Sequence, residues 1–251
     1  MAVDPASHYS SRLVLLSSPA GQRLAASLTV TGGSRLRTLL SLFEAQEEQS
    51  WCGYAALRVA LRACGAAAVL SQSELHGLRS TLAEQEAEDV RGGASSLAGG
   101  GLSIAQLARL ARPLLEASAL NLEQQHGDPA SPPAFGSQLA AAVSHASDSD
   151  SGSIVLLNFL RQLDGWRGGH WVVAGGLAHD AEGTAFVLLL DVAAHRIGPH
   201  WLPLGLLAAL CSTVNVHGVP RGFVRICSRG SGASGDGAVP LVPKQDSASH
   251  C

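Results

Sequence analysis

The hydrophobic pattern of the chain changes from helical to strand-like spacing at about residue 150. In the first half, Leu36, Leu39 and Phe43 recur at the spacing of one helical face. A glycine pair at 32–33 is expected to end the preceding helix, and the stretch 121–133 is polar and proline-bearing. Helices are predicted over 17–30, 34–46, 54–64, 104–110 and 135–145, with two short helical pieces within 71–90.

The second half carries runs of apolar residues typical of buried strands. After a polar linker at 147–153, apolar runs occupy 154–159, 171–176 and 184–192. Their length and composition favour strands that are covered on both faces. A helical first half followed by a sheet-forming second half predicts an α+β fold of two subdomains, with a cleft between them.

Length and composition favour one large domain with an unstructured tail. The chain has 251 residues, and we expect a catalytic domain over 1–228 and a disordered Gly/Ser-rich tail over 229–251. A net charge of -3 argues against a nucleic-acid partner. The apolar run Leu13 to Leu16 is too short to span a membrane, so we expect no membrane partner and a cytoplasmic location.

The cysteines do not form a pattern of metal ligands or disulfides. The five are Cys52, Cys64, Cys211, Cys227 and Cys251, an odd number without a CxxC pair. Neither a zinc cage nor a disulfide framework is indicated, and a reducing compartment fits best. His195, His200 and His217 gather late in the chain without a recognisable ligand spacing, so no metal-ligating residue is assigned.

Cys52 is the strongest candidate nucleophile. It immediately precedes the helix predicted over 54–64, and the amide groups at a helix N-terminus stabilise a thiolate. Gln46 lies six residues upstream and could place an amide donor beside the sulfur, as an oxyanion hole requires. The alternative reading is that Cys52 is a small buried apolar residue, as most cysteines in globular proteins are.

His170 and Asp191 are the candidate base and its orienting carboxylate. A two-residue turn at Ala181-Glu182 would pair residues whose numbers sum to 363, which makes Asp191 the diagonal neighbour of His170. The preceding Gly169 leaves room for a ligand to approach the backbone. With Cys52, these residues would form a Cys-His-Asp triad in papain-like chain order. Considered alone, His170 could instead be a surface histidine, and Asp191 could be a turn residue at the end of a strand.

The chain resembles the phytochelatin synthases, the glutathione gamma-glutamylcysteinyltransferase family of papain-like enzymes. The resemblance covers about residues 12–228. Its motifs are Ser-Ser-Pro-x-Gly at 17–21, the 46–57 stretch with Trp-Cys-Gly, Asn-Phe-Leu-Arg at 158–161, Gly-Gly-His at 168–170, Leu-Asp-Val-Ala at 190–193, Pro-His-Trp at 199–201 and Arg-Gly-Phe at 221–223. It implies a papain-like fold, with a helical N-terminal subdomain packed on a C-terminal antiparallel sheet and the active-site cleft between them.

The resemblance also implies roles for single residues. Cys52, His170 and Asp191 fall on the catalytic positions and Gln46 on the oxyanion-hole position. Arg221 and Asn215 fall on the positions that hold the gamma-glutamyl group, where Asn215 replaces an acid. The positions of Ala194 and Ile197 usually carry an arginine and a tyrosine.

The implied reaction is transfer of gamma-glutamylcysteine from glutathione to a second glutathione through a Cys52 thioester, with release of glycine. No tightly bound cofactor is implied, and cadmium or zinc would enter as thiolate complexes of the substrate. Two alternatives remain open at this point: a glutathione or glutathione-conjugate hydrolase, and an inactive thiol- and metal-binding protein. A homodimer is left open as well.

Overall fold

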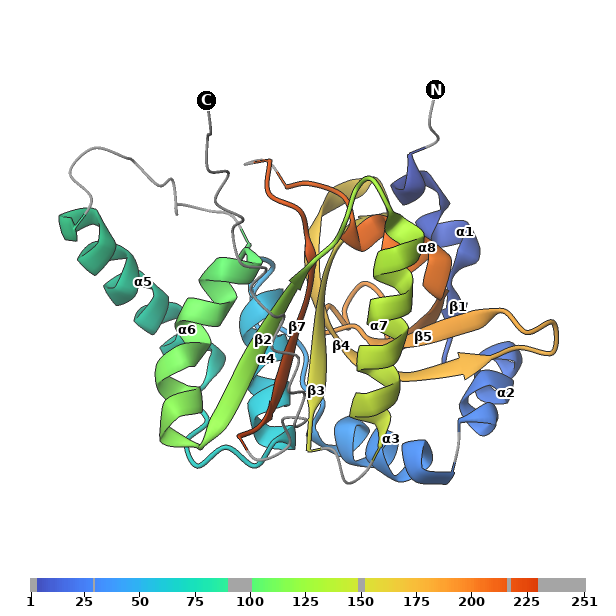
Figure 1. Ribbon diagram of the computed structural model, residues 1–251, viewed down its shortest axis with the longest axis horizontal. Helices are drawn as coiled ribbons and strands as arrows, with labels where there is room; N and C mark the ends of the chain where they lie inside the picture. The colour runs from blue at the N-terminus through green and yellow to red at the C-terminus, as the bar shows by residue number, and fades with distance from the viewer. Residues whose placement is uncertain (1–3, 29, 90–100, 149–151, 216–217, 230–251) are drawn as a thin grey trace, which may run out of the picture.

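An antiparallel sheet forms the centre of the molecule, and helices cover both of its faces. The computed structural model describes residues 4–28, 30–89, 101–148, 152–215 and 218–229. Within these ranges, seven strands are ordered β1-β6-β5-β4-β3-β7-β2, and every neighbouring pair is antiparallel (Figure 1). The strands are β1 (Val14–Leu15), β2 (Leu120–His126), β3 (Ile154–Leu163), β4 (Trp166–His179), β5 (Ala185–Leu190), β6 (His200–Pro203) and β7 (Gly222–Ser228).

The side chains of the central strands alternate between two hydrophobic clusters because successive residues of a strand point to opposite faces. Leu156 belongs to one cluster and Leu157 to the other, and both are fully buried. The first cluster packs on α3 (Val30–Leu42), α4 (Cys52–Ala63) and α6 (Ile104–Ala117). The second packs on the N-terminal segment with η1 (Pro5–His8) and α1 (Tyr9–Arg12), on α7 (Pro132–Ser147) and on α8 (Leu204–Cys211).

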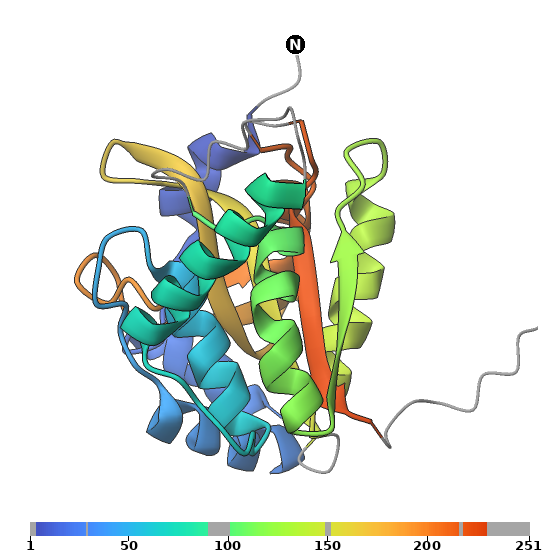
Figure 2. The same cartoon turned by 90° about the vertical axis from the view of Figure 1, so that its left-hand side faces the viewer.

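The remaining helices lie beside these layers. Helix α2 (Pro19–Ser27) contacts β4, and α5 (Gln72–Asp89) contacts α4 and α6. Figure 2 shows α4, α5 and α6 together on one side of the molecule. The predicted α+β architecture, with a helical N-terminal part packed on a C-terminal antiparallel sheet, is confirmed. Among the described residues, none of the helices has the length and apolar character needed to cross a membrane.

Two local predictions were wrong, and one strand was not predicted. Helix α3 runs through the glycine pair at 32–33, because a glycine costs a helix only about 1 kcal/mol and the packing of Leu36 and Leu39 outweighs it. One helix, α5, replaces the two pieces expected within 71–90. The polar stretch 121–133, to which no strand was assigned, contains most of β2, which pairs with β7 along its whole length. Most of this edge strand is exposed, so it lacks the apolar alternation that marks a half-buried strand.

The β4–β5 hairpin reaches the predicted register at the site by a different route. Its far end pairs His179 with Ala185, so the residue numbers sum to 364 instead of 363. A β-bulge between Ala174 and Gly176 inserts one extra residue and restores the sum of 363 at Val173 and Leu190. The loop is thus one residue longer than expected, and the bulge compensates for it next to the site.

The predicted tail at 229–251 lies almost wholly outside the described residues, as do residues 149–151 of the expected linker. The last described strand, β7, ends at Ser228, and Arg229 donates its backbone N–H to Ala119.

Candidate active site

Cys52 is the first residue of α4, as predicted. Its side chain is buried, with 5% of the residue exposed, and the backbone N–H of Trp171 on β4 helps to lower the pKa of the thiol. The first amide groups of an α-helix have no partner within the helix, so the N–H of Cys52 is directed out of its N-terminus. The helix therefore presents both a sulfur and a backbone donor at the point where it meets β4.

His170 connects this sulfur to Asp191. Its Nε2 lies 2.6 Å from Oδ1 of Asp191, which leaves Nδ1 for the Cys52 sulfur, whose charge and hydrogen-bonding capacity help to raise the His170 pKa. The same carboxylate oxygen accepts the backbone N–H of Ala193 at 2.9 Å. His170 and Asp191 are 2% and 0% exposed, so neither side chain reorients freely in solvent. The structure thus brings together His170 and Asp191, the two residues that the hairpin argument predicted to be neighbours, and places His170 at a cavity that Cys52 also lines.

Arg161 is a fourth member of this cluster, and sequence reasoning assigned it no role. Its Nη1 lies 2.8 Å from Oδ2 of Asp191 and 2.9 Å from Nε2 of His170. Because the Nε2–H of His170 is engaged with Asp191, the carboxylate is the acceptor for Arg161. The guanidinium also lies 5.1 Å from the ring centroid of Trp166. The available signal was a charged residue inside the apolar strand run that ends at Leu163.

The electrostatics of the cluster favour a thiolate and an imidazolium. Burial opposes ionisation of the Cys52 thiol, but its hydrogen bond with His170 and the His170 charge outweigh burial and lower its pKa. Burial opposes protonation of His170, but the charge and hydrogen bond of Asp191 outweigh it and raise the His170 pKa. Burial opposes ionisation of Asp191 as well, but His170 and Arg161 hold its pKa well below the usual range.

Gln46 lies beside Cys52, but its amide nitrogen is engaged. Nε2 donates to the backbone oxygen of Glu48 at 2.8 Å and to that of Gln49 at 2.9 Å. Oε1 is buried and has no partner among the described protein atoms. The backbone N–H of Gln46 donates to the oxygen of Val192 at 2.8 Å, which ties this loop to the segment just after Asp191. Sequence spacing predicted the location of this amide but not its bonds.

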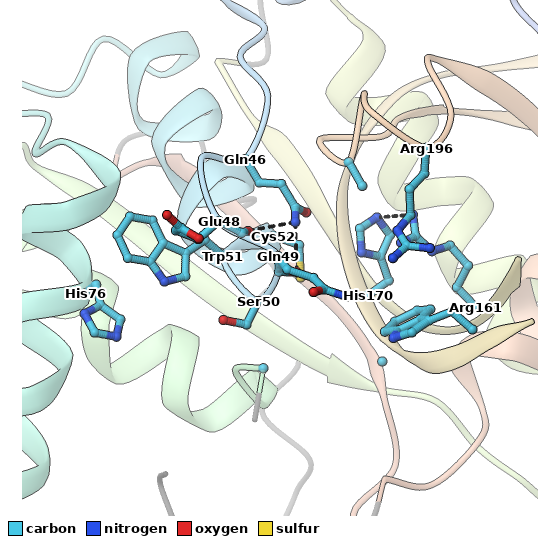
Figure 3. A pocket seen from close by; sticks show the side chains of 14 residues that line it. Gln46, Glu48, Gln49, Ser50, Trp51, Cys52, His76, Arg161, His170 and Arg196 are labelled. Atoms are coloured by element: carbon cyan, nitrogen blue, oxygen red, sulfur yellow. Dashed lines mark hydrogen bonds between the residues drawn. The ribbon is translucent and has the colours of Figure 1, made fainter. Parts of the chain in front are cut away.

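A cavity of about 550 Å³ opens over the Cys52 sulfur. Figure 3 shows Cys52 between two walls: Trp51 and His76 on one side, and His170, Arg161 and Arg196 on the other. The Trp51 and His76 rings stack with centroids 5.1 Å apart. Gly169 also lines the cavity, as the Gly-Gly-His motif led us to expect. The space is concave, partly polar and centred on the candidate nucleophile, as a small-molecule site requires.

Arg221 lies directly behind Gly169. A Cβ on Gly169 would come within 3.3 Å of Arg221 Nη2, so the absence of a side chain there makes room for the guanidinium. Nε and Nη1 of Arg221 are buried and have no partner among the described protein atoms. Burial lowers the pKa of Arg221, although Cys211 opposes the shift. A buried cation with unused donors is suited to bind a carboxylate.

Asn215 does not appear among the described residues that line the cavity. Its Oδ1 accepts the backbone N–H of Val219 at 3.1 Å, which closes the turn that leads to Arg221. Its predicted contact with substrate therefore stays a prediction.

The described histidines among those considered as metal ligands lie in different surroundings. His200 is fully buried, and its Nε2 lies 2.8 Å from the hydroxyl of Tyr9. His195 is exposed, and His217 lies outside the described residues. In the part of the chain that the structure describes, no three His, Cys, Asp or Glu side chains gather in a way that could hold a metal ion.

Comparison with known proteins identifies the family. A search of the curated proteins finds no match. The family model for phytochelatin synthase matches residues 6–223, a span that includes Cys52, His170, Asp191 and the cavity around them. The chain therefore belongs to the phytochelatin synthase family, an enzyme family of acyltransferases.

Proposed function

We propose that this protein transfers the gamma-glutamylcysteinyl group of glutathione to a second glutathione, by way of a thioester on Cys52. One observation carries the proposal: the Cys52 sulfur sits at a helix N-terminus, shares a cavity of about 550 Å³ with a histidine that Asp191 orients, and has its pKa lowered by that histidine. This is the arrangement that nucleophilic acyl transfer requires.

In the first half-reaction, the Cys52 thiolate attacks the carbonyl carbon of the Cys-Gly peptide bond. Negative charge develops on the carbonyl oxygen, and the backbone N–H of Cys52 is one donor available to it. Gln46 supplies the second donor when one of its two amide hydrogens turns from a loop carbonyl to the oxyanion. The His170 imidazolium then gives its proton to the nitrogen of the leaving glycine, and the C–N bond breaks.

In the second half-reaction, neutral His170 removes a proton from the alpha-amino group of a second glutathione. The amine attacks the thioester carbonyl, a new peptide bond forms and Cys52 leaves as a thiolate. Cadmium or zinc bound to glutathione thiols would enter as part of the substrate. Water in place of the amine would give hydrolysis, so the acceptor decides between the transferase and the glutathione hydrolase.

Arg221 is the residue that we propose holds the alpha-carboxylate of the gamma-glutamyl group, since its guanidinium lies behind Gly169 and carries two donors without a partner among the described protein atoms. The family carries an acid at the Asn215 position to hold the substrate ammonium. Here Asn215 offers a neutral amide. It contributes to substrate binding only if the turn that it closes lies next to the bound substrate.

The test is incubation of purified protein with glutathione, with and without cadmium, and identification of products by mass spectrometry. Release of glycine together with a product longer by one gamma-glutamylcysteine unit supports transfer. Glycine release without the longer product identifies a hydrolase. No glycine release under either condition, with the protein folded, contradicts both and leaves a thiol- and metal-binding protein.

A further inference from the structure

A buried side chain on α5 clamps the backbone on both sides of Gln46. Gln72 is the first residue of α5 and is 1% exposed. Its Oε1 accepts the backbone N–H of Glu47 at 3.0 Å, and its Nε2 donates to the backbone oxygen of Ala45 at 2.8 Å. The Gln72 amide thus bonds the residue before Gln46 and the residue after it, as a neighbouring strand bonds an extended chain.

The opposite edge of the same segment is bonded as well. The N–H of Gln46 points away from Gln72 and donates to the oxygen of Val192 at 2.8 Å. In an extended peptide, the C=O of residue i−1 and the N–H of residue i+1 point to one side and the N–H of residue i to the other. Gln72 and Val192 therefore hold the two edges of the backbone that carries Gln46.

The clamp is anchored to the helix that carries Cys52. Nε2 of Gln72 also donates to Oε1 of Glu44 at 3.2 Å. Oε2 of Glu44 forms ion pairs with Arg58 and Arg62, both on α4. The amide of Gln72 thereby has its acceptor and its donors engaged, and a fully satisfied polar network of this kind specifies one geometry.

We propose that Gln72 is a positioning residue of the active site, which acts through Gln46. Gln72 holds residues 45 and 47, and the Gln46 side chain in turn holds the carbonyls of Glu48 and Gln49, just before α4. An oxyanion donor contributes only when it is placed at the developing charge, so a displaced Gln46 would slow acylation without weakening the binding of substrate. This inference rests on the proposed function for its kinetic consequence, and its geometric part is tested without any substrate.

The substrate-free test is hydrogen exchange of single backbone amides, measured by NMR in wild type and in Gln72→Met. Methionine has similar length but cannot bond the backbone. We expect the Glu47 amide to exchange at least about tenfold faster in the variant, and the Gln46 amide to follow it, while the Ala55 amide in α4 is unchanged. Unchanged exchange at Glu47 and Gln46 overturns the clamp whatever the substrate is.

The kinetic test is a double-mutant cycle with glutathione as substrate and glycine release as the readout. Loss of an oxyanion-hole donor typically costs about 10² to 10³ in kcat, so Gln46→Ala should fall in this range. A displaced donor costs less, so Gln72→Met should lower kcat by at least about tenfold and leave KM within about twofold. Since Gln72 acts through Gln46, adding Gln72→Met to Gln46→Ala should slow the reaction no further.

Gln22 offers a matched control variant. It lies in the first turn of α2, and its Nε2 donates to the backbone oxygen of Leu16 at 2.7 Å, far in the chain from Gln46. Gln22→Met should leave kcat unchanged. If Gln72→Met does not fold, Gln72→Glu, which keeps the acceptor for the Glu47 N–H and loses the donor, enters the same cycle. The proposal is overturned if the effects of Gln46→Ala and Gln72→Met on kcat multiply in the double variant. It is also overturned if Gln22→Met lowers kcat as much as Gln72→Met does. Absence of glycine release in wild type refutes the proposed function and leaves the exchange test to decide on the clamp.

Discussion

Replacing Asp191 by asparagine should do more than disturb the orientation of His170. The carboxylate is 0% exposed, and its two oxygens take Nε2 of His170 and Nη1 of Arg161. Asparagine keeps one oxygen and presents an NH₂ group in place of the other. Arg161, whose side chain is 4% exposed, would then be a buried cation without a carboxylate partner.

The magnitude follows from this burial. Removing one partner of a buried ion pair costs about 3 to 5 kcal/mol, because the remaining charge is not compensated. For a domain of this size each kcal/mol shifts Tm by about 2 to 4 °C, so Asp191→Asn should lower Tm by on the order of 10 °C. Adding Arg161→Met removes the stranded charge and should restore most of this stability. It should not restore glycine release, because His170 still lacks its orienting carboxylate.

The assay is urea unfolding of wild type, Asp191→Asn and the double variant, with glycine release measured on each.

The pH dependence of stability gives a further check. The pKa of Asp191 is lower in the native state than in the unfolded chain, where it is about 3.9. Its contribution to stability is therefore present above about pH 3.9 and is lost as pH falls from there toward the native pKa. The stability difference between wild type and Asp191→Asn should therefore shrink in acid. It should also fall as pH rises through the pKa of His170, because Asp191 raises that pKa only in wild type. A single variant as stable as wild type, or a double variant less stable than the single, would refute the argument.

Three further outcomes are expected. Cys52→Ser should abolish glycine release, whereas Cys211→Ser, which alters a fully buried thiol outside the cavity lining, should retain it; equal loss in both would contradict the assignment of the nucleophile. At pH 7 iodoacetamide should label Cys52 before Cys64, because the pKa of the Cys52 thiol is lowered while burial raises the pKa of Cys64 to about 11; peptide mapping showing the reverse order would contradict the ion pair. Arg221→Met should raise KM for glutathione about tenfold to a hundredfold, as expected for a lost hydrogen bond to a charged group, with little change in kcat. The increase should vanish for an analogue without the alpha-carboxylate, and an equal increase for both substrates would place Arg221 outside the site.

The sequence by itself determined the local elements around the candidate nucleophile and the class of fold. A run rich in alanine, leucine and arginine from Ala55 to Ala63 is enough to form a helix close behind Cys52, and helix propensity depends only on neighbouring residues. The apolar runs that became β3, β4 and β5 are long enough to be strands buried on both faces. These features depend on short-range pattern, which a sequence displays directly.

The tertiary structure decided the contacts that join distant segments. Hairpin arithmetic reached the correct register at Leu190 only because a longer loop and a bulge offset each other, and nothing local in the sequence reveals a compensating bulge. Arg161 joins Asp191 from another strand, and Gln72 reaches residues 45 and 47 from another helix. A buried polar side chain is defined by the partners that satisfy it, and those partners become neighbours only when the sheet and the helices have packed. For this reason the sequence indicated the nucleophile and its base, while the fold alone determined which charges and amides hold them in place.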